Sequence, residues 1–334
     1  MSSSVGEEGQ GSSLLRVVLF WGVAALLVVV AFVVTVVTLN ATMYSASGFA
    51  RGYVAAVDRG DVQSALAYAG IEPSDADGDA LLSVPSRGGI DDVEAVDDVA
   101  LDDGTHAVTL GYTVDGEPAQ SQFVVQQTAD RFGLFRAWRF AQAPVASLDV
   151  TPQADPRFRV DGRTVTAAQS DVATRYLVLA PSTFELDHES AWLTADEQRV
   201  VVPSVGGTVS AAVATRAKDS FVESVQDDLD RFLDEECLPQ RVLLPAGCPF
   251  GRQVDDRLLG EPTWTLPEHP VVEIVPAPTP GLWQVPAVPA TAHLEVEAQR
   301  LFDGTRYTID DDVPFTLSYL ITIGTDDALR IEAQ

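Results

Sequence analysis

Basic residues are scarce in this sequence of 334 residues. It has 21 Lys and Arg against 49 Asp and Glu, a formal net charge of −28, and Lys218 is its single lysine. A surface this acidic repels nucleic acid and anionic lipid headgroups. The composition therefore excludes nucleic acid as a partner, and it suits a soluble domain or one that attracts cations.

Residues that carry catalysis or bind metals are few and scattered. None of the four histidines lies at a ligand spacing from another (His106, His188, His269 and His293). The sequence has no Gly-x-Ser-x-Gly turn, no P-loop and no Gly-x-Gly-x-x-Gly turn. We therefore predict no catalytic, cofactor-binding or metal-ligating residues, and we expect that the protein is not an enzyme.

One acidic stretch, Asp75–Asp79, places carboxylates at alternate positions, as calcium loops do. An EF-hand that begins at Asp75 requires Gly at position 80 and Glu at position 86, where this chain has Ala80 and Ser86. We interpret the stretch as an acidic surface loop. A cation-responsive acidic domain remains a weaker hypothesis.

Only two cysteines are present, and ten residues separate Cys237 from Cys248. In an exported domain, a pair this close is most simply a disulfide. Half of a metal site and a redox pair are the alternatives. No histidine or further cysteine accompanies the pair at ligand spacing, and the spacing does not match Cys-x-x-Cys. We predict a structural disulfide.

One long hydrophobic run is present. Val17–Leu39 contains 23 consecutive uncharged residues, and a helix of this length reaches roughly 34 Å, enough to cross a hydrocarbon core. A signal peptide has a shorter apolar region of about 7 to 15 residues, although Ser45–Ser47 offers small residues to a peptidase. A helix in a soluble core would show a polar face. We predict an uncleaved transmembrane helix over residues 14–39 that contacts the bilayer through residues 17–39.

The orientation of this helix is not decided by a count of Lys and Arg alone. Arg16 adjoins the run on its N-terminal side, whereas Arg51 lies twelve residues beyond Leu39. The position of Arg16 and the predicted disulfide both favour a cytoplasmic N-terminus. We expect residues 1–13 to form a short disordered cytoplasmic tail and everything after the helix to lie outside the cytoplasm.

The first predicted domain covers residues 40–145. An apolar stripe that includes Phe49 and Tyr53 predicts one helix, Gly60 ends it, and Asp61 can cap a second. Residues 72–103 are acidic and contain scattered Gly and Pro, which predicts a loop with at most one short element. Three antiparallel strands follow between residues 105 and 141.

A small all-β module is predicted over residues 146–204. Three prolines between Ala143 and Pro156 suggest its start, and the glycine-containing segment Ser204–Thr208 suggests its end. Asp161-Gly162 between two short strands is typical of a two-residue type I′ hairpin. Further short strands follow without a convincing long helix.

The last predicted domain covers residues 205–334 and contains the disulfide loop. Its helix has an apolar face and an acidic face, which we interpret as solvated, and the disulfide would fix the end of that helix. A proline-rich passage runs from Pro262 to Pro289. After it, alternating residues predict strands, the clearest of which contains Phe315, Leu317, Tyr319, Ile321 and Ile323.

The segment Phe49–Ile71, FARGYVAAVDRGDVQSALAYAGI, resembles the opening of nuclear-transport-factor-2-like (NTF2-like, cystatin-like) α+β domains. The order of tail, single helix and successive small domains resembles actinobacterial single-pass membrane-anchored envelope proteins, distantly including the teicoplanin-resistance-associated type. This chain lacks the N-terminal zinc ribbon of that type. The resemblance implies an α+β ectodomain, with two NTF2-like domains flanking the β module, at the outer face of a bacterial plasma membrane.

These patterns together favour a membrane-tethered binding or scaffold protein of the cell envelope. Its expected partner is an envelope protein or a wall polymer. The alternative is a small-molecule-binding or enzymatic pocket inside one of the curved sheets. We place Tyr112 and His106 on opposite faces of one strand, so we expect no polar dyad in the first domain.

Overall fold

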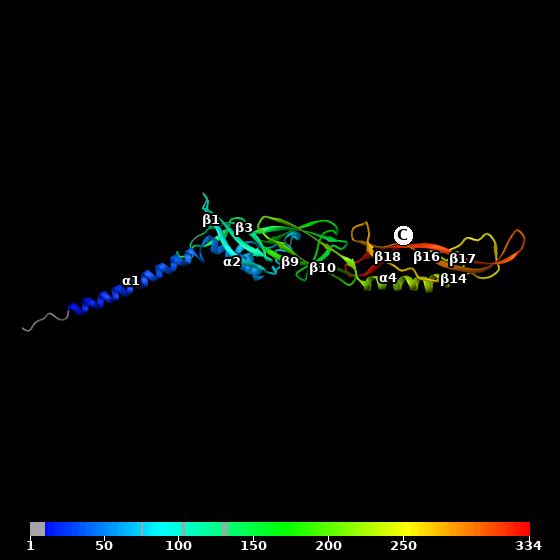
Figure 1. The fold of residues 1–334 in the computed structure, drawn as a ribbon, viewed down its shortest axis with the longest axis horizontal. Coiled ribbons are helices and arrows are strands. Elements are labelled where there is room, and N and C mark those ends of the chain that lie inside the picture. Colours follow the sequence, from blue (N-terminus) through cyan, green and yellow to red (C-terminus); the bar gives the residue numbers. More distant parts are fainter. Residues whose placement is uncertain (1–10, 75, 102–103, 129, 131–132) are drawn as a thin grey trace, which may run out of the picture.

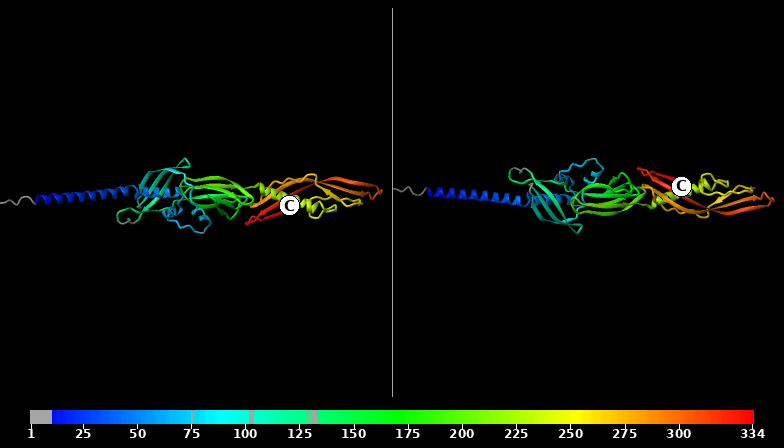
Figure 2. Two further views of the ribbon diagram at one scale, coloured as in Figure 1. Left: turned by 90° about the horizontal axis from the view of Figure 1, so that it is seen from below. Right: turned by 90° about the horizontal axis from the view of Figure 1, so that it is seen from above.

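The computed structural model describes residues 11–74, 76–101, 104–128, 130 and 133–334, with side chains from Arg16 onward. The chain is a mixed α+β protein with several antiparallel sheets. Its shape is elongated, with one long helix at one end and three folded parts that follow it in a row (Figure 1; Figure 2).

The long helix α1 (Gly11–Ala41) begins inside the predicted tail and ends just past the apolar run. From Arg16 to Ala41 it is long and apolar enough to cross a membrane, and its most apolar window has no residue buried in the protein. This lack of burial excludes a soluble core helix. Residues 1–10 of the predicted tail lie outside the described residues.

The end of α1 is fixed to the first folded part. The side-chain amide of Asn40 donates to the Leu134 carbonyl at 2.8 Å, and its oxygen accepts from the Arg136 amide at 3.0 Å. The Trp138 indole N–H donates to the Tyr44 carbonyl at 2.9 Å. These contacts join residues more than 90 positions apart, so the helix leaves the domain in one defined direction.

Two short helices open the first domain, as predicted. The Ser45 hydroxyl caps α2 (Ala46–Asp58), and the Asp61 carboxylate caps α3 (Val62–Ala69) by accepting from the Ser64 amide at 3.1 Å. Gly70 ends α3 with φ of +67°, which glycine adopts without a steric penalty. A 3₁₀ turn, η1 (Asp77–Asp79), follows.

The helices pack on a four-stranded antiparallel meander. Its order is β1 (Ile90–Ala100), β2 (Thr105–Val114), β3 (Glu117–Gln127) and β4 (Trp138–Phe140). The rings of Tyr53, Phe123 and Phe140 form its core.

The prediction of a loop over residues 72–103 is wrong for β1. This strand lies at the sheet edge, carries two register shifts, and buries only Ile90 fully. Its other side chains are largely exposed, so it lacks the apolar alternation that marks a half-buried strand. The strand is held by its backbone hydrogen bonds to β2 rather than by burial of its side chains.

The central part is an all-β module of two facing sheets. One has the order β12-β10-β9-β6-β7 and the other β11-β5-β8. Phe158, Tyr176 and Phe184 lie in the core between them. The strands are β5 (Val145–Gln153), β6 (Arg157–Val160), β7 (Arg163–Thr166), β8 (Thr174–Leu179), β9 (Ser182–Glu189), β10 (Leu193–Val202), β11 (Thr208–Ala214) and β12 (Arg216–Ala217).

Two sequence signals in this module have different outcomes. Asp161 and Gly162 have φ of +50° and +77°, as the predicted type I′ turn requires. The boundary predicted after residue 204, however, lies inside the module, because β11 pairs in parallel with β5. The glycine segment is a tight turn whose Gly206 amide bonds the Val145 carbonyl at 2.8 Å, rather than a linker.

The C-terminal domain packs one helix on a long antiparallel sheet. Helix α4 (Asp219–Arg231) continues into a π-helical turn, η2 (Phe232–Cys237). The sheet follows the path β13-β16-β17-β18, with β14 and β15 also paired to β16. Its strands are β13 (Arg257–Leu258), β14 (Thr263–Thr265), β15 (Val275–Pro276), β16 (Leu282–Gln299), β17 (Arg306–Ile323) and β18 (Leu329–Ala333).

The apolar face of α4 and the alternation in β17 are confirmed. Phe221, Val225 and Leu229 are buried against the inward-facing side chains of β16 and β17. The proline-rich passage contains more strand than expected, because β16 begins at Leu282. A register shift between Val285 and Val288 accommodates Pro286, which cannot donate to a ladder.

The joint between the first domain and the central module is buried and polar. The Tyr53 hydroxyl lies 3.0 Å from both the Pro144 and Ala180 carbonyls. Burial raises the pKa of Tyr53 above its usual value, so the group stays a neutral donor. The Tyr112 hydroxyl also crosses the joint, donating to the Pro203 carbonyl at 2.7 Å.

The joint between the central module and the C-terminal domain is also polar but only partly buried. The Trp192 indole donates to the Asp327 carbonyl at 2.6 Å and packs on the Phe221 ring. The Arg157 guanidinium pairs with the Asp327 carboxylate at 2.9 Å. Direct bonds at both joints connect the three parts into one rod.

We predict that Tyr53→Phe destabilises the first joint by about 1–3 kcal/mol, because it leaves the buried Ala180 carbonyl without this donor. Chemical denaturation of the wild-type and variant chains measures the loss. Tyr68→Phe is the matched control, since it removes a partly exposed hydroxyl and should change stability by less than about 0.5 kcal/mol. Equal effects of the two changes would contradict the role assigned to Tyr53.

Candidate functional site

The structure does not bring the four histidines together. His106 lies in the first domain, where its Nδ1 is 2.8 Å from Asp98 Oδ1 and its ring meets the edge of Trp138. The placement of His106 and Tyr112 on opposite faces is wrong, because residues six apart in a regular strand share a face. Both side chains lie on the inner face of β2.

The other histidines have local structural partners. His188 is buried, with Nδ1 2.8 Å from the Arg157 carbonyl. His269 lies 2.9 Å from Asp234. Within the described part of the chain, no three His, Cys, Asp or Glu side chains are placed to hold a metal ion. Asp75, the first residue of the rejected calcium loop, lies outside the described residues.

His293 has the most acidic surroundings of the four. On the outer face of β16 its Nδ1 lies 3.0 Å from Asp312 Oδ1, and its Nε2 lies 3.2 Å from Asp310 Oδ1. The hydrogen bond to Asp312, with the nearby carboxylates, raises the pKa of His293 above 6.5. His293 therefore lies between two carboxylates of this acidic face, both of which favour its protonated form.

A disulfide joins Cys237 to Cys248. Cys237 is buried at the end of η2 beneath the sheet, and the bond closes the loop directly after the helix. The loop is further fixed by Gln240, whose amide donates to the Glu236 and Ala246 carbonyls. This arrangement supplies a rigid wall beside α4.

A cleft of about 530 Å³ lies against that wall, and we call it the C-terminal cleft. Leu229 and Phe232 of the helix line one side, Cys248 lines another, and Tyr319 and Ile331 belong to the sheet. This volume falls within the range of small-molecule sites. Its acid, Asp228, is already paired with Arg231 at 2.8 Å, so the cleft offers an apolar surface rather than an acid–base pair.

Strand β17 has an open edge beside this cleft. Strand β18 pairs with Tyr319–Ile323, and the Gln334 amide after it bonds the Ser318 carbonyl, so residues 306–317 have a ladder partner on the β16 side alone in the described chain. Pro314 and the three aspartates 310–312 lie along this edge, and such residues oppose indiscriminate strand pairing.

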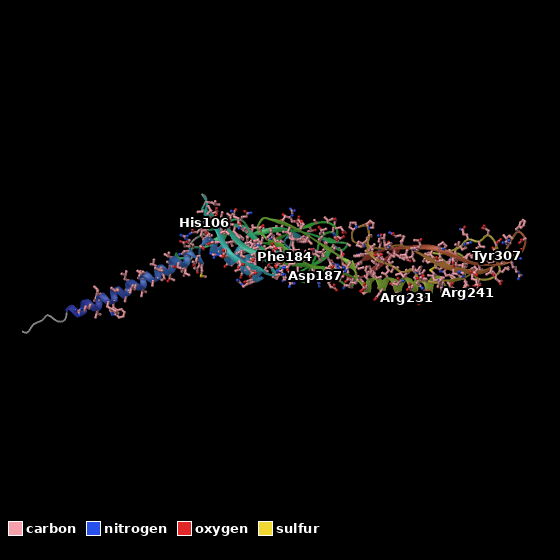
Figure 3. All side chains as sticks on the ribbon, viewed as in Figure 1. His106, Phe184, Asp187, Arg231, Arg241 and Tyr307 are labelled. Atoms are coloured by element: carbon pink, nitrogen blue, oxygen red, sulfur yellow. A yellow bond between two sulfur atoms is a disulfide. The ribbon has the colours of Figure 1, made fainter. Side chains whose placement is uncertain are left out.

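The turn between β16 and β17, Arg300–Thr305, is the end of the rod farthest from α1, and we call it the distal tip (Figure 1). Figure 3 labels Tyr307, at the start of β17, and Arg241, in the disulfide loop, at this end, whereas His106 lies near α1. Each strand of this ribbon has 18 residues, which corresponds to a length of about 60 Å.

The distal tip is held rigidly. The Arg300 amide donates to the Thr305 carbonyl at 2.9 Å, and Gly304 closes the turn with φ of +75°. Asp256 lies directly before β13. Its carboxylate accepts from the Leu301 amide at 3.2 Å and from the Tyr307 hydroxyl at 2.7 Å. A turn with these bonds keeps its shape without any apolar side chain.

Two large apolar side chains nevertheless project from the distal tip. Leu301 is 71% exposed and Phe302 is 99% exposed. These two residues were not predicted from the sequence, although it contains a signal for them. Asp303-Gly304 predicts a hairpin turn, and a Leu-Phe pair next to such a turn lies too far from the core to be buried in it. Covering such side chains contributes about 1.5–3 kcal/mol each, so the tip is suited to contact a partner.

Comparisons of the chain with protein-family models, with curated proteins and with solved structures find no match.

Replacing both cysteines with serine should lower the stability of the C-terminal domain by about 3 kcal/mol, by the chain-entropy estimate for this short loop. Thermal unfolding followed by tryptophan fluorescence measures the loss, because Trp264 and Trp283 are buried in that core. An unchanged unfolding curve would contradict a stabilising role for the bond.

The imidazole of His293 should titrate with a midpoint above 6.5, and Asp312→Asn should lower that midpoint. Because the folded-state pKa is raised, the stabilisation is present in full below pH 6.5 and is lost as the pH rises through the folded-state pKa. Histidine NMR titration measures both values. If the titration midpoint of His293 is the same in Asp312→Asn as in the wild type, the assigned cause is wrong.

Proposed function

We propose that the protein is a membrane-tethered rod that presents a binding surface at its distal tip to a partner in the cell envelope. The observation that carries this proposal is the exposure of Leu301 and Phe302 at the end opposite the apolar helix. The apolar side chains favour a protein partner over a wall polymer, because burial of apolar surface drives protein association.

The anchor, rather than a cleaved signal, is supported by the structure around the small residues. Ser45 caps α2, and Ala46 is buried in the first domain. Cleavage at Ser45–Ser47 would remove this cap and the hydrogen bonds of Asn40 with Leu134 and Arg136, which we call the Asn40 clamp. The disulfide is consistent with domains outside the cytoplasm, and this favours a cytoplasmic N-terminus.

The resemblance to NTF2-like domains belongs to the same proposal. In the first domain, a capped pair of helices precedes a four-stranded antiparallel sheet, and the C-terminal domain also packs a helix on an antiparallel sheet. This order supports kinship with actinobacterial envelope proteins that carry such domains behind one membrane helix.

Placement of a photo-crosslinking residue at Phe302 tests the distal tip in intact cells that make the protein. We expect a covalent adduct whose mass is unchanged by wall-degrading enzymes and whose tryptic peptides include those of a second protein. The same residue at Val96, an exposed apolar position on β1, is the matched control and should give no such adduct. Equal adducts at both positions, or none at Phe302, would overturn the proposal.

A second candidate function rests on the C-terminal cleft, which has the size and apolar lining of a small-molecule site. Ser318→Trp places a larger side chain at its wall, at a partly exposed position, and should abolish binding of an apolar fluorescent probe without unfolding the domain. If the wild-type chain leaves the fluorescence of the probe unchanged, the cleft is not a binding site.

A further inference from the structure

A second hollow lies at the opposite end of the rod. This groove, of about 660 Å³, opens between the α2–α3 helix pair and β4 of the first domain. The side chains that matter here are Met43, Phe49, Tyr68, Arg136, Trp138 and Arg139. We call it the membrane-proximal groove. It has no role in the function proposed for the distal tip.

The groove lies at the height of lipid headgroups if α1 is the membrane anchor, and to that extent the inference rests on the proposed function. Met43 is four residues beyond Leu39, the last residue of the apolar run, and a helical rise places it about 6 Å farther along the axis. Headgroup layers extend about 5–7 Å beyond each side of the hydrocarbon core. The Asn40 clamp holds the groove at this height.

The charges of the groove are unusual for so acidic a chain. Arg136 and Arg139 are exposed, and neither pairs with a carboxylate among the described residues, although Arg139 donates to the uncharged side-chain oxygen of Gln126 at 2.5 Å. In the central module, by contrast, Arg159 and Arg175 each bind an aspartate through two nitrogens. An anion that enters the groove therefore meets Arg136 directly and competes with Gln126 for Arg139.

The net charge does not cancel this local attraction. Salt screens charges beyond about 10 Å at moderate ionic strength, so an anion inside the groove interacts mainly with the two arginines beside it. Guanidinium groups bind phosphate oxygens through paired hydrogen bonds. The acidic composition therefore excludes a general attraction to anionic membranes without excluding one held headgroup.

The apolar lining completes the match to a lipid. Met43 is 70% exposed, and the ring of Phe49 lies against those of Tyr68 and Phe140. Tyrosine and tryptophan are enriched at membrane interfaces, where an apolar ring meets polar headgroups. A lipid phosphate and the upper part of its glycerol and acyl region present this same combination.

We propose that the membrane-proximal groove binds a phospholipid of the outer leaflet, with Arg136 and Arg139 on the phosphate and Met43 against the apolar part. The bound lipid seats the first domain on the bilayer surface. Together with the Asn40 clamp, it sets the direction in which the rod leaves the membrane.

The test uses the full chain in nanodiscs that contain phosphatidylglycerol with a photoactivatable group near its glycerol. We expect labelled peptides from α3 or from residues 133–140, and at least tenfold less label in the double variant Arg136→Gln and Arg139→Gln. The matched control is Arg257→Gln with Arg306→Gln, two exposed arginines of the distal end, which should label like the wild type. The wild type and both double variants should have the same melting temperature.

Two outcomes overturn the proposal and are distinguishable. If the chain resists extraction by alkaline carbonate but the groove is unlabelled, or the double variant labels like the wild type, lipid binding in the groove is wrong while the anchor stands. If carbonate releases the wild-type chain, α1 is not an anchor, and both this inference and the proposed function fail.

Discussion

The buried hydroxyl of Tyr53 is the contact on which the arrangement of the molecule most depends. It comes from α2, the first helix after α1, and reaches the carbonyl of Pro144, directly before β5, and that of Ala180, between β8 and β9 of the central module. An unpaired buried carbonyl is costly, so the two parts cannot rotate freely about this point. The bonds of Trp192 and Arg157 to Asp327 impose the same constraint on the next joint.

The rod that results separates two surfaces. The apolar distal tip lies at one end, and the groove with its two arginines lies at the other, next to α1. A flexible chain of domains would present the tip at many heights and angles. Fixed joints instead place it at one distance from α1, which suits the proposed role of reaching a partner across the envelope.

Local sequence signals predicted the parts that local physics determines. The Asp61 cap, the Asp161-Gly162 hairpin, the apolar face of α4 and the alternation in β17 each follow from periodicity or turn chemistry within one segment. Strand β1 was missed because most of its side chains are exposed and it lacks apolar alternation, and the pairing of β11 with β5 was missed because the two strands lie far apart in the sequence.

The candidate sites were harder to predict for the same reason. The distal tip could have been inferred from Leu301-Phe302 beside a turn signal, whereas the membrane-proximal groove could not. Its arginines lie over 90 positions from Met43, and only the folding of β4 back to the end of α1 brings them together. The sequence gives only the total charge of the chain, whereas the structure shows where the individual charged side chains lie.

The central claim is that the three folded parts form one rod, and distances between spin labels across each joint test it most directly. Labels on non-canonical residues at Val96 and Val172 span the first joint, and labels at Val172 and Val271 span the second. All three positions are exposed, and this labelling leaves the disulfide intact. The account predicts one narrow distance distribution for each pair in the full chain. Broad distributions would contradict it, because they would show parts that move independently.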